Sequence, residues 1–274
     1  MMVKKFLTAI TLLVTATLVA ANPTIEAVNN QWTFSLGKQR MDYHEYDNYD
    51  DVPTRYLDSE TGSQPAFAVS YVRQMNTNAV ENLYLKGAMA FAHGETRYNG
   101  YLYNSGTGVY TPYRTTTDTT TFDLEGKIGK GFAIGRQAQL TPYVNLSFHE
   151  WIRDMSDDPY GYKEIYWHYA YGVGVLGQYA FSSHLVAHLD ASIGRTTLGR
   201  MWADDTDNTY HLGARPVKTL DVGLTYLIDK KWSVHGGYRL TKFEYGESPV
   251  VHGYYEPEST TKLQTIYLGL GWRY

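Results

Sequence analysis

Charged and imidazole side chains recur at alternate positions along this chain, and they are the groups with which it could do chemistry. Asp123, Glu125 and Lys127 follow this spacing, as do His188 and Asp190. Such side chains can pair as ions, bind a metal, move protons or line a polar passage. Period-two spacing indicates a β-strand with one polar face. We assign to polar faces Asp123, Glu125, Lys127, His149, His168, His188, Asp190, Asp221, His235, Arg239 and Arg273.

The histidines of this set could form a metal site or respond to pH. His188 and Asp190 share a strand face, and His149 and His168 fall on neighbouring segments. A metal site needs several such ligands converging on one ion, and nothing in the spacing requires them to converge. We therefore predict no metal and no cofactor, and we keep pH gating through histidine as a minor alternative.

The elements that carry these residues form ten segments of alternating polarity, each long enough to cross a bilayer as a tilted strand. They are 31–42, 65–74, 81–97, 118–134, 138–152, 164–180, 184–198, 215–228, 231–244 and 260–274. Short turns at 75–80, 135–137, 181–183 and 228–230 alternate with longer loops at 43–64, 98–117, 153–163, 199–213 and 245–258. This layout predicts an all-β fold, a closed antiparallel transmembrane up-and-down β-barrel of ten strands.

Alternative folds remain open. Merging segments would give eight strands, and strands within the long loops would give twelve. A soluble lipocalin-like barrel would turn its apolar face inward and would need no aromatic girdles. Cysteine is absent from the sequence, so we expect the strand ladders, not disulfides, to hold the fold.

Both ends of the chain agree with export to a membrane. Lys4 and Lys5 precede an apolar run at 6–19 and small residues at 19–21, which predicts a signal peptide at 1–21 and a barrel domain at 22–274. The last strand alternates apolar residues and ends on Leu270, Trp272 and Tyr274. This ending resembles the signal by which the barrel assembly machinery of Gram-negative bacteria recognises its clients. The resemblance implies a bacterial outer-membrane protein.

Charge and topology add further expectations. Removing Lys4 and Lys5 takes 24 basic residues to 22 against 28 acidic ones, a net charge of −6, which argues against nucleic-acid binding. An even strand count places both termini on the short-turn side, in the periplasm. We expect a monomer whose partners are outer-membrane lipid, lipopolysaccharide and, during biogenesis, the assembly machinery.

The polar set faces the lumen if the apolar residues face lipid. Acids and bases alternate around it, so we favour a hydrogen-bonded network that fills a narrow barrel. Ten strands enclose a lumen only a little wider than side chains can fill. A narrow pore for small solutes, with Asp123, Glu125, Lys127 and Arg239 setting its ion selectivity, is the alternative.

The layout also resembles the omptins, outer-membrane proteases with barrels of this size. That resemblance would imply an Asp pair in the second long loop and an Asp-x-His in the fourth. Here the second loop contains no acid, and the fourth contains Asp204, Asp205 and Asp207 with His211 four residues further on. The motif is absent, so we predict no enzyme. An omptin-like protease and a lipid-modifying barrel enzyme remain as weaker alternatives.

The long loops are rich in tyrosine, which provides contact area and a hydroxyl at low entropic cost. These residues are Tyr43, Tyr46, Tyr49, Tyr56, Tyr98, Tyr101, Tyr103, Tyr110, Tyr113, Tyr160, Tyr162, Tyr254 and Tyr255. The layout resembles opacity-type adhesins, so we predict a structural or adhesin-like role with host or glycan ligands; the alternative is that the tyrosines pack the loops together. Seven acids of the first loop, Asp42, Glu45, Asp47, Asp50, Asp51, Asp58 and Glu60, are expected to be solvated.

Overall fold

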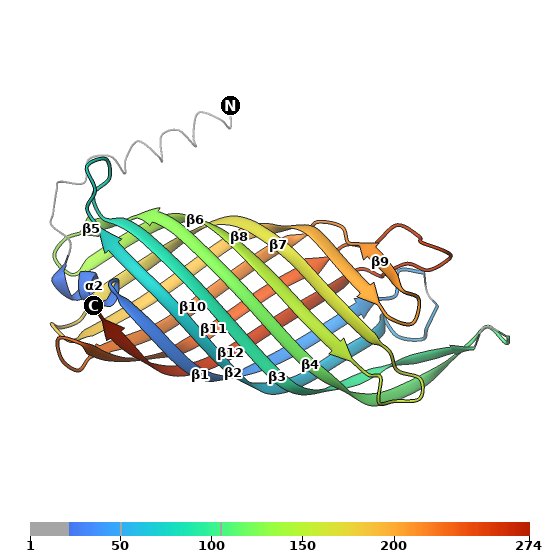
Figure 1. Ribbon diagram of the computed structural model, residues 1–274. Coiled ribbons are helices and arrows are strands. Elements are labelled where there is room, and N and C mark those ends of the chain that lie inside the picture. Colours follow the sequence, from blue (N-terminus) through green and yellow to red (C-terminus); the bar gives the residue numbers. More distant parts are fainter. Residues whose placement is uncertain (1–21, 50, 105) are drawn as a thin grey trace, which may run out of the picture.

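The computed structural model describes residues 22–49, 51–104 and 106–274, and these residues form a closed antiparallel β-barrel (Figure 1). Within them, ten strands follow one another around the barrel in the order β1, β2, β3, β4, β6, β7, β8, β10, β11 and β12. The first strand pairs with β12 as well as with β2, which closes the sheet and leaves no edge. The predicted fold class is confirmed. The predicted signal peptide at 1–21 lies outside the described residues.

The elements have the following bounds. The barrel strands are β1 (Gln31–Tyr46), β2 (Tyr56–Met75), β3 (Leu83–Asn104), β4 (Val109–Lys130), β6 (Ala138–Asp154), β7 (Lys163–Ala180), β8 (Leu185–Ala203), β10 (Pro216–Leu227), β11 (Trp232–Tyr245) and β12 (Ser259–Arg273). Two short strands, β5 (Phe132–Ile134) and β9 (Asn208–His211), extend hairpins with β6 and β8, and one short helix, α2 (Pro23–Val28), precedes β1.

Several strands continue well past the ends that the apolar pattern predicts. The ladder between β3 and β4 runs without a break to the pair Asn104–Val109, so most of the predicted loop 98–117 is a hairpin that projects beyond the barrel wall (Figure 1). The first loop likewise shrinks to the segment between Tyr46 and Tyr56. The prediction ended these strands too early because it followed apolar alternation, whereas the backbone ladder continues where both faces are polar or aromatic.

The outer surface carries a continuous belt of exposed apolar side chains. Leu36, Leu146 and Ile266 are 71%, 69% and 67% exposed. Side chains of this kind belong against hydrocarbon, because soluble proteins do not expose so large an apolar surface. At the long-loop end the belt gives way to outward charges, among them Lys38 and Glu150. No helix among the described residues is long and apolar enough to cross a bilayer.

The short helix α2 lies across the short-turn mouth, beside the C-terminus (Figure 1). Its start is fixed by an N-cap: the Asn22 side chain accepts hydrogen bonds from the backbone N–H groups of Thr24 and Ile25. Pro23, which favours the first turn of a helix, follows directly. Ile25 is fully buried against inward residues of β7, β8 and β10, namely Ala180, Val186 and Leu227. A helix of six residues owes its stability to this packing.

Candidate functional site: a layered lumen and its outer rim

Most of the polar residues predicted to face the lumen meet in its middle section. Lys127 donates to Asp190 at 2.6 Å, and Arg239 donates to Glu125 at 2.7 Å. Five neighbour steps around the barrel of ten strands separate β4, which carries Glu125, from β11, which carries Arg239. This ion pair therefore joins opposite walls and crosses the lumen.

The middle section is balanced in charge. Three bases, Lys86, Lys127 and Arg239, lie among three acids, Glu125, Asp190 and Asp221, with contacts between 2.6 and 3.9 Å. We call these six residues the charge layer. Buried charges are tolerated when they are paired and hydrogen-bonded, so this arrangement has the form of a filled network.

Two tyrosines complete the charge layer. Tyr143 donates to Asp190, and Tyr267 donates to Asp221 at 2.8 Å. Glycines on neighbouring strands make room for both rings: a Cβ at Gly174 would lie 2.4 Å from the Tyr143 ring, and one at Gly237 would lie 2.5 Å from the Tyr267 hydroxyl. Bulky residues at these two glycines would therefore displace the tyrosines from the carboxylates.

The predicted histidines lie around the charge layer, each beside a different partner. His188 lies 3.3 Å from Asp221, and the His235 ring lies 2.8 Å from the Ser35 hydroxyl. Nearer the long-loop end, His149 lies 2.8 Å from Asp123 and His168 lies 2.7 Å from the Tyr245 hydroxyl. Among the described residues, no group of three or more histidines and acids has the arrangement of a metal site.

The remaining predicted site residues lie at the short-turn end. Arg273 does not join the charge layer; it donates to the backbone carbonyl of Asp229 in the turn before β11. The predicted assembly-signal residues Leu270, Trp272 and Tyr274 all point outward and are exposed. Tyr274 stacks on Tyr71 with ring centroids 5.4 Å apart, as expected of an aromatic girdle.

A layer of amide side chains crosses the short-turn end of the lumen. Asn29, directly after α2, donates to Gln74 of β2 at 2.7 Å and to Gln178 of β7 at 2.8 Å. Gln74 is also hydrogen-bonded to Gln139 of β6 at 2.9 Å. We call these four residues the amide layer. The amide layer and α2 lie at this mouth, and a cavity of about 280 Å³ whose lining includes Val28 and Asn29 extends from them into the lumen.

The long-loop end of the lumen is filled by an aromatic layer. Its buried members are Met41, Tyr43, Trp151, Tyr166, Met201, Ala203, Tyr210, Leu212, Phe243, Tyr245 and Leu263. Trp151 stacks on Tyr166 with ring centroids 5.1 Å apart, and Tyr166 stacks on Tyr245 at 6.0 Å. Most of these residues lie at the alternate strand positions whose side chains face the lumen. The lumen therefore changes from polar in the middle to aromatic at this end.

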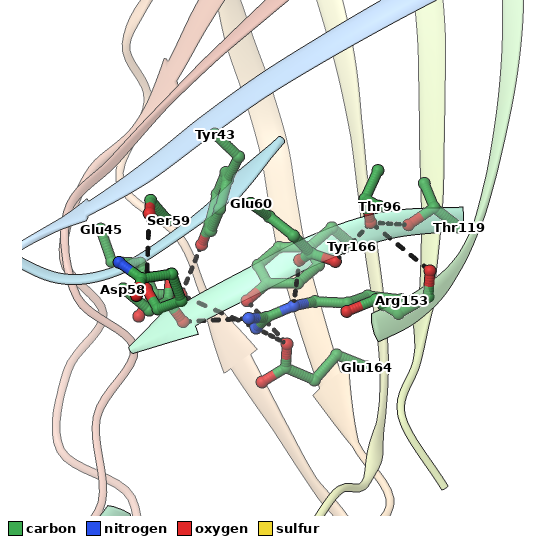
Figure 2. Close-up of polar contacts among 12 residues, drawn as sticks. Tyr43, Glu45, Asp58, Ser59, Glu60, Thr96, Thr119, Arg153, Glu164 and Tyr166 are labelled. Atoms are coloured by element: carbon green, nitrogen blue, oxygen red, sulfur yellow. Dashed lines mark hydrogen bonds and ion pairs between the residues drawn. The ribbon is translucent and has the colours of Figure 1, made fainter. Parts of the chain in front are cut away.

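One arginine and several carboxylates are buried beside the aromatic layer (Figure 2). Arg153 donates to Glu60 at 2.7 Å, to Asp58 at 2.9 Å and to Glu164, and its guanidinium lies 4.0 Å from Glu45. Tyr166 donates to a fifth buried acid, Glu256, at 2.8 Å. We call Arg153 and these five acids the Arg153 cluster. It lies past Glu150 of β6, where charged side chains begin to face outward, and so beyond the apolar belt.

Five acids around one base leave an excess of negative charge, which shifts the ionisation of the cluster. Burial raises the pKa of Asp58 to about 6, although Arg153 opposes the rise. Burial, together with neighbouring acids, also raises the pKa of Glu45 and Glu256 well above the ordinary range. Burial disfavours the charged guanidinium of Arg153, but Glu164 and the other carboxylates outweigh it and raise its pKa. The cluster can therefore retain protons near neutral pH.

The expectation that the acids of the first loop are solvated is wrong for three of them. Glu45, Asp58 and Glu60 are buried, because β1 and β2 continue into the predicted loop and turn these side chains inward. The sequence did contain a signal, because Glu45 follows Met41 and Tyr43 at the same two-residue spacing and so lies on the same face of the strand. Asp50 lies outside the described residues.

Several tyrosines of the long loops pack against one another and also remain exposed. Some pack together, as in the pairs Tyr103–Tyr110 at 4.8 Å and Tyr49–Tyr255 at 5.7 Å between ring centroids. Tyr49 and Tyr103 of these pairs, and also Tyr160 and Tyr254, are more than half exposed. Packing between loops and contact with a ligand are thus both available to this surface.

The acids of the fourth loop have structural partners. Asp204 accepts from the backbone N–H of Lys163 at 2.8 Å, and Asp207 accepts from the Trp202 indole at 3.2 Å. His211 is exposed at the end of β9. This arrangement supplies no paired nucleophile and base.

Fold and lumen together define a closed antiparallel barrel with an apolar outer belt and a cross-linked polar interior. No family model and no curated protein matches the chain. Among solved structures it is similar to the outer membrane protease OmpT of Escherichia coli, with 10% identity, 90% of this chain and 97% of that chain covered, and a TM-score of 0.49.

Two further similar structures are translocation domains of autotransporters. The transport unit of AIDA-I from Escherichia coli has 12% identity, coverage of 98% and 97%, and a TM-score of 0.45. The translocator domain of NalP from Neisseria meningitidis has 10% identity, coverage of 100% and 95%, and a TM-score of 0.40. None of these likenesses assigns a role to this chain.

Proposed function

We propose that this protein is an outer-membrane β-barrel that acts at its outer surface, through the strand extensions and loops beyond the belt, and that it is neither an open channel nor an enzyme. In this orientation the short turns and both termini face the periplasm. The observation that carries the proposal is the filled lumen. The amide and charge layers join facing walls through hydrogen bonds and ion pairs, and the aromatic layer packs side chains together at the long-loop end, so a solute would have to pass three cross-linked or packed layers.

The surface at the long-loop end presents exposed side chains that a ligand could contact. The hairpin of β3 and β4 projects beyond the barrel (Figure 1) and presents Tyr103, which is 58% exposed. Tyr160, in the connection between β6 and β7, is 66% exposed. Exposed tyrosines on a rigid support suit recognition of glycans or proteins, since little side-chain entropy is lost on binding.

Two double variants, one a test and one a control, examine this role. Tyr103→Ser with Tyr160→Ser alters the projecting surface, whereas Tyr179→Ser with Tyr226→Ser alters exposed tyrosines at the opposite, short-turn end. Each protein is displayed on bacteria and applied to a glycan array and to cultured epithelial cells. We expect the first variant to lose binding and the second to keep it. Equal binding by wild type and both variants would remove the adhesin-like role.

A narrow channel is the second candidate, and the cavity of about 280 Å³ in the middle of the lumen favours it. Conduction would require α2 with the amide layer to move at one end and the aromatic layer to move at the other. A protease remains a weaker alternative, because the acids of the fourth loop are engaged in structural hydrogen bonds.

A further inference from the structure

A row of three lysines crosses the outside of the barrel at the border of the apolar belt that is nearer the long-loop end. In the ladder, Lys218 of β10 pairs with Lys242 of β11, and Lys242 pairs with Lys262 of β12. We call these residues the lysine row. Like charges directly opposite each other destabilise a sheet, so the row gains stability from an anion that lies against it.

The neighbouring acids neutralise the row only in part. Lys242 forms an ion pair with Glu244 at 3.0 Å. Asp42 is the ladder partner of Lys262, but its carboxylate lies 3.0 Å from the His44 ring and forms no ion pair with Lys262 among the described residues. Within the described part of the chain, Lys218 and Lys262 form no ion pair. Further outward bases flank the row on β8 and β1, namely Arg195, Arg40 and Lys38.

The opposite side of the barrel has no such excess. Within the strands from β2 to β7, the outward charges beyond the belt are the acids Glu95, Asp118, Glu150 and Asp154 and the bases Arg97, Arg114 and Lys163. The chain as a whole carries a net charge of −4. The six bases between β8 and β1 are therefore gathered on one side, against the overall sign of the protein.

The position of the row indicates what kind of anion it takes. Leu220, two residues from Lys218 on the same outward face, is exposed, as are Ile266 and Leu36 on neighbouring strands. A ligand on this face meets ammonium groups at one level and exposed aliphatic side chains directly below. We infer that the lysine row binds the phosphate groups of a phosphorylated membrane glycolipid whose acyl chains lie on this part of the belt.

This inference rests on the proposed membrane location, and a lipid titration tests it. Full-length mature protein in neutral detergent is titrated with a phosphorylated glycolipid and with its dephosphorylated counterpart bearing the same acyl chains. The test variant is Lys218→Gln with Lys242→Gln and Lys262→Gln. The matched control removes the same charge on the other side, by Arg97→Gln with Arg114→Gln and Lys163→Gln.

We expect wild type to prefer the phosphorylated lipid. The test variant should bind it about 100-fold more weakly, at roughly fivefold per lysine, and the control should bind as wild type does. Equal loss in the control, or no preference by wild type, would overturn the inference. Competition by inorganic phosphate as effective as that by the lipid would show a site for free anions and would also overturn it.

A vesicle-insertion measurement separates this inference from the proposal beneath it. Protein that inserts into vesicles but shows no lipid preference contradicts the lysine row alone. Protein that shows β circular dichroism but does not insert contradicts the outer-membrane role itself.

Discussion

Replacing Arg153 with methionine should loosen the long-loop end of the barrel and leave the apolar belt intact. Arg153 is almost completely buried and donates to three carboxylates. Removing one partner of a buried ion pair costs about 3–5 kcal/mol. The abandoned carboxyls can instead take up protons. Neutralising one carboxyl of ordinary pKa costs about 5 kcal/mol at pH 8 but only about 1 kcal/mol at pH 5.

The Arg153→Met variant should therefore lose about 3–5 kcal/mol of local stability at pH 8 and about 1–2 kcal/mol at pH 5. Urea titration read by pulse proteolysis of the connection after β1 measures the local loss, and heat-modifiable gel migration reports the barrel. Arg114→Met is the control, because Arg114 is exposed and donates a hydrogen bond to Asn99; it should change stability by no more than about 0.5 kcal/mol. Unchanged protease resistance at pH 8, or a larger loss at pH 5 than at pH 8, would refute the reasoning.

Three further predictions concern the same interior. Burial raises the pKa of Asp58 to about 6 and also raises the pKa of Glu45 and Glu256. The stability that these acids contribute is complete below their ordinary pKa values and is lost as pH rises through the raised values. Proteolysis of the long loops should therefore speed up from pH 5 to pH 8, and less so in Glu256→Gln. Lys127→Met should lower the free energy of unfolding by about 3–5 kcal/mol, because it leaves the Asp190 carboxylate buried without its ion-pair partner. Adding Asp190→Asn should recover at least about 1 kcal/mol in urea titration, and additive losses from the two substitutions would contradict the pairing. Ile25→Ala should weaken the docking of α2 by about 2–4 kcal/mol, seen as faster amide exchange in α2 with unchanged exchange in β7; unchanged exchange in α2 would contradict its packing role.

Period-two alternation was sufficient to predict the strands within the membrane belt. The reason is physical: lipid on one side and a narrow lumen on the other impose opposite polarities on successive residues. Leu268 and Leu270 point outward as that pattern requires, and Lys127 and Asp190 point inward. The pattern fails beyond the belt, where water on the outside no longer demands apolar side chains. The β3–β4 hairpin therefore extends further than the sequence predicted.

The contacts across the lumen could not be predicted in the same way. Arg153 meets Glu60, 93 positions away, only because closure and register bring β6 and β2 to face each other. Alternation fixes which face a residue occupies, but not the partner that it meets across the barrel. The helix α2 was missed for another reason: six residues are too few for helical periodicity, although Asn22 followed by Pro23 is a recognisable helix start.

Single-channel recording in a planar bilayer tests the central claim most directly, that the lumen is closed and the protein acts at its surface. Residues 22–274 are refolded, their folding is verified by β circular dichroism and heat-modifiable gel migration, and current is then recorded across the bilayer. The filled lumen predicts a silent bilayer. Steady, discrete conductance steps whose ion selectivity changes on Arg239→Gln would contradict the claim and would make the charge layer the lining of a pore.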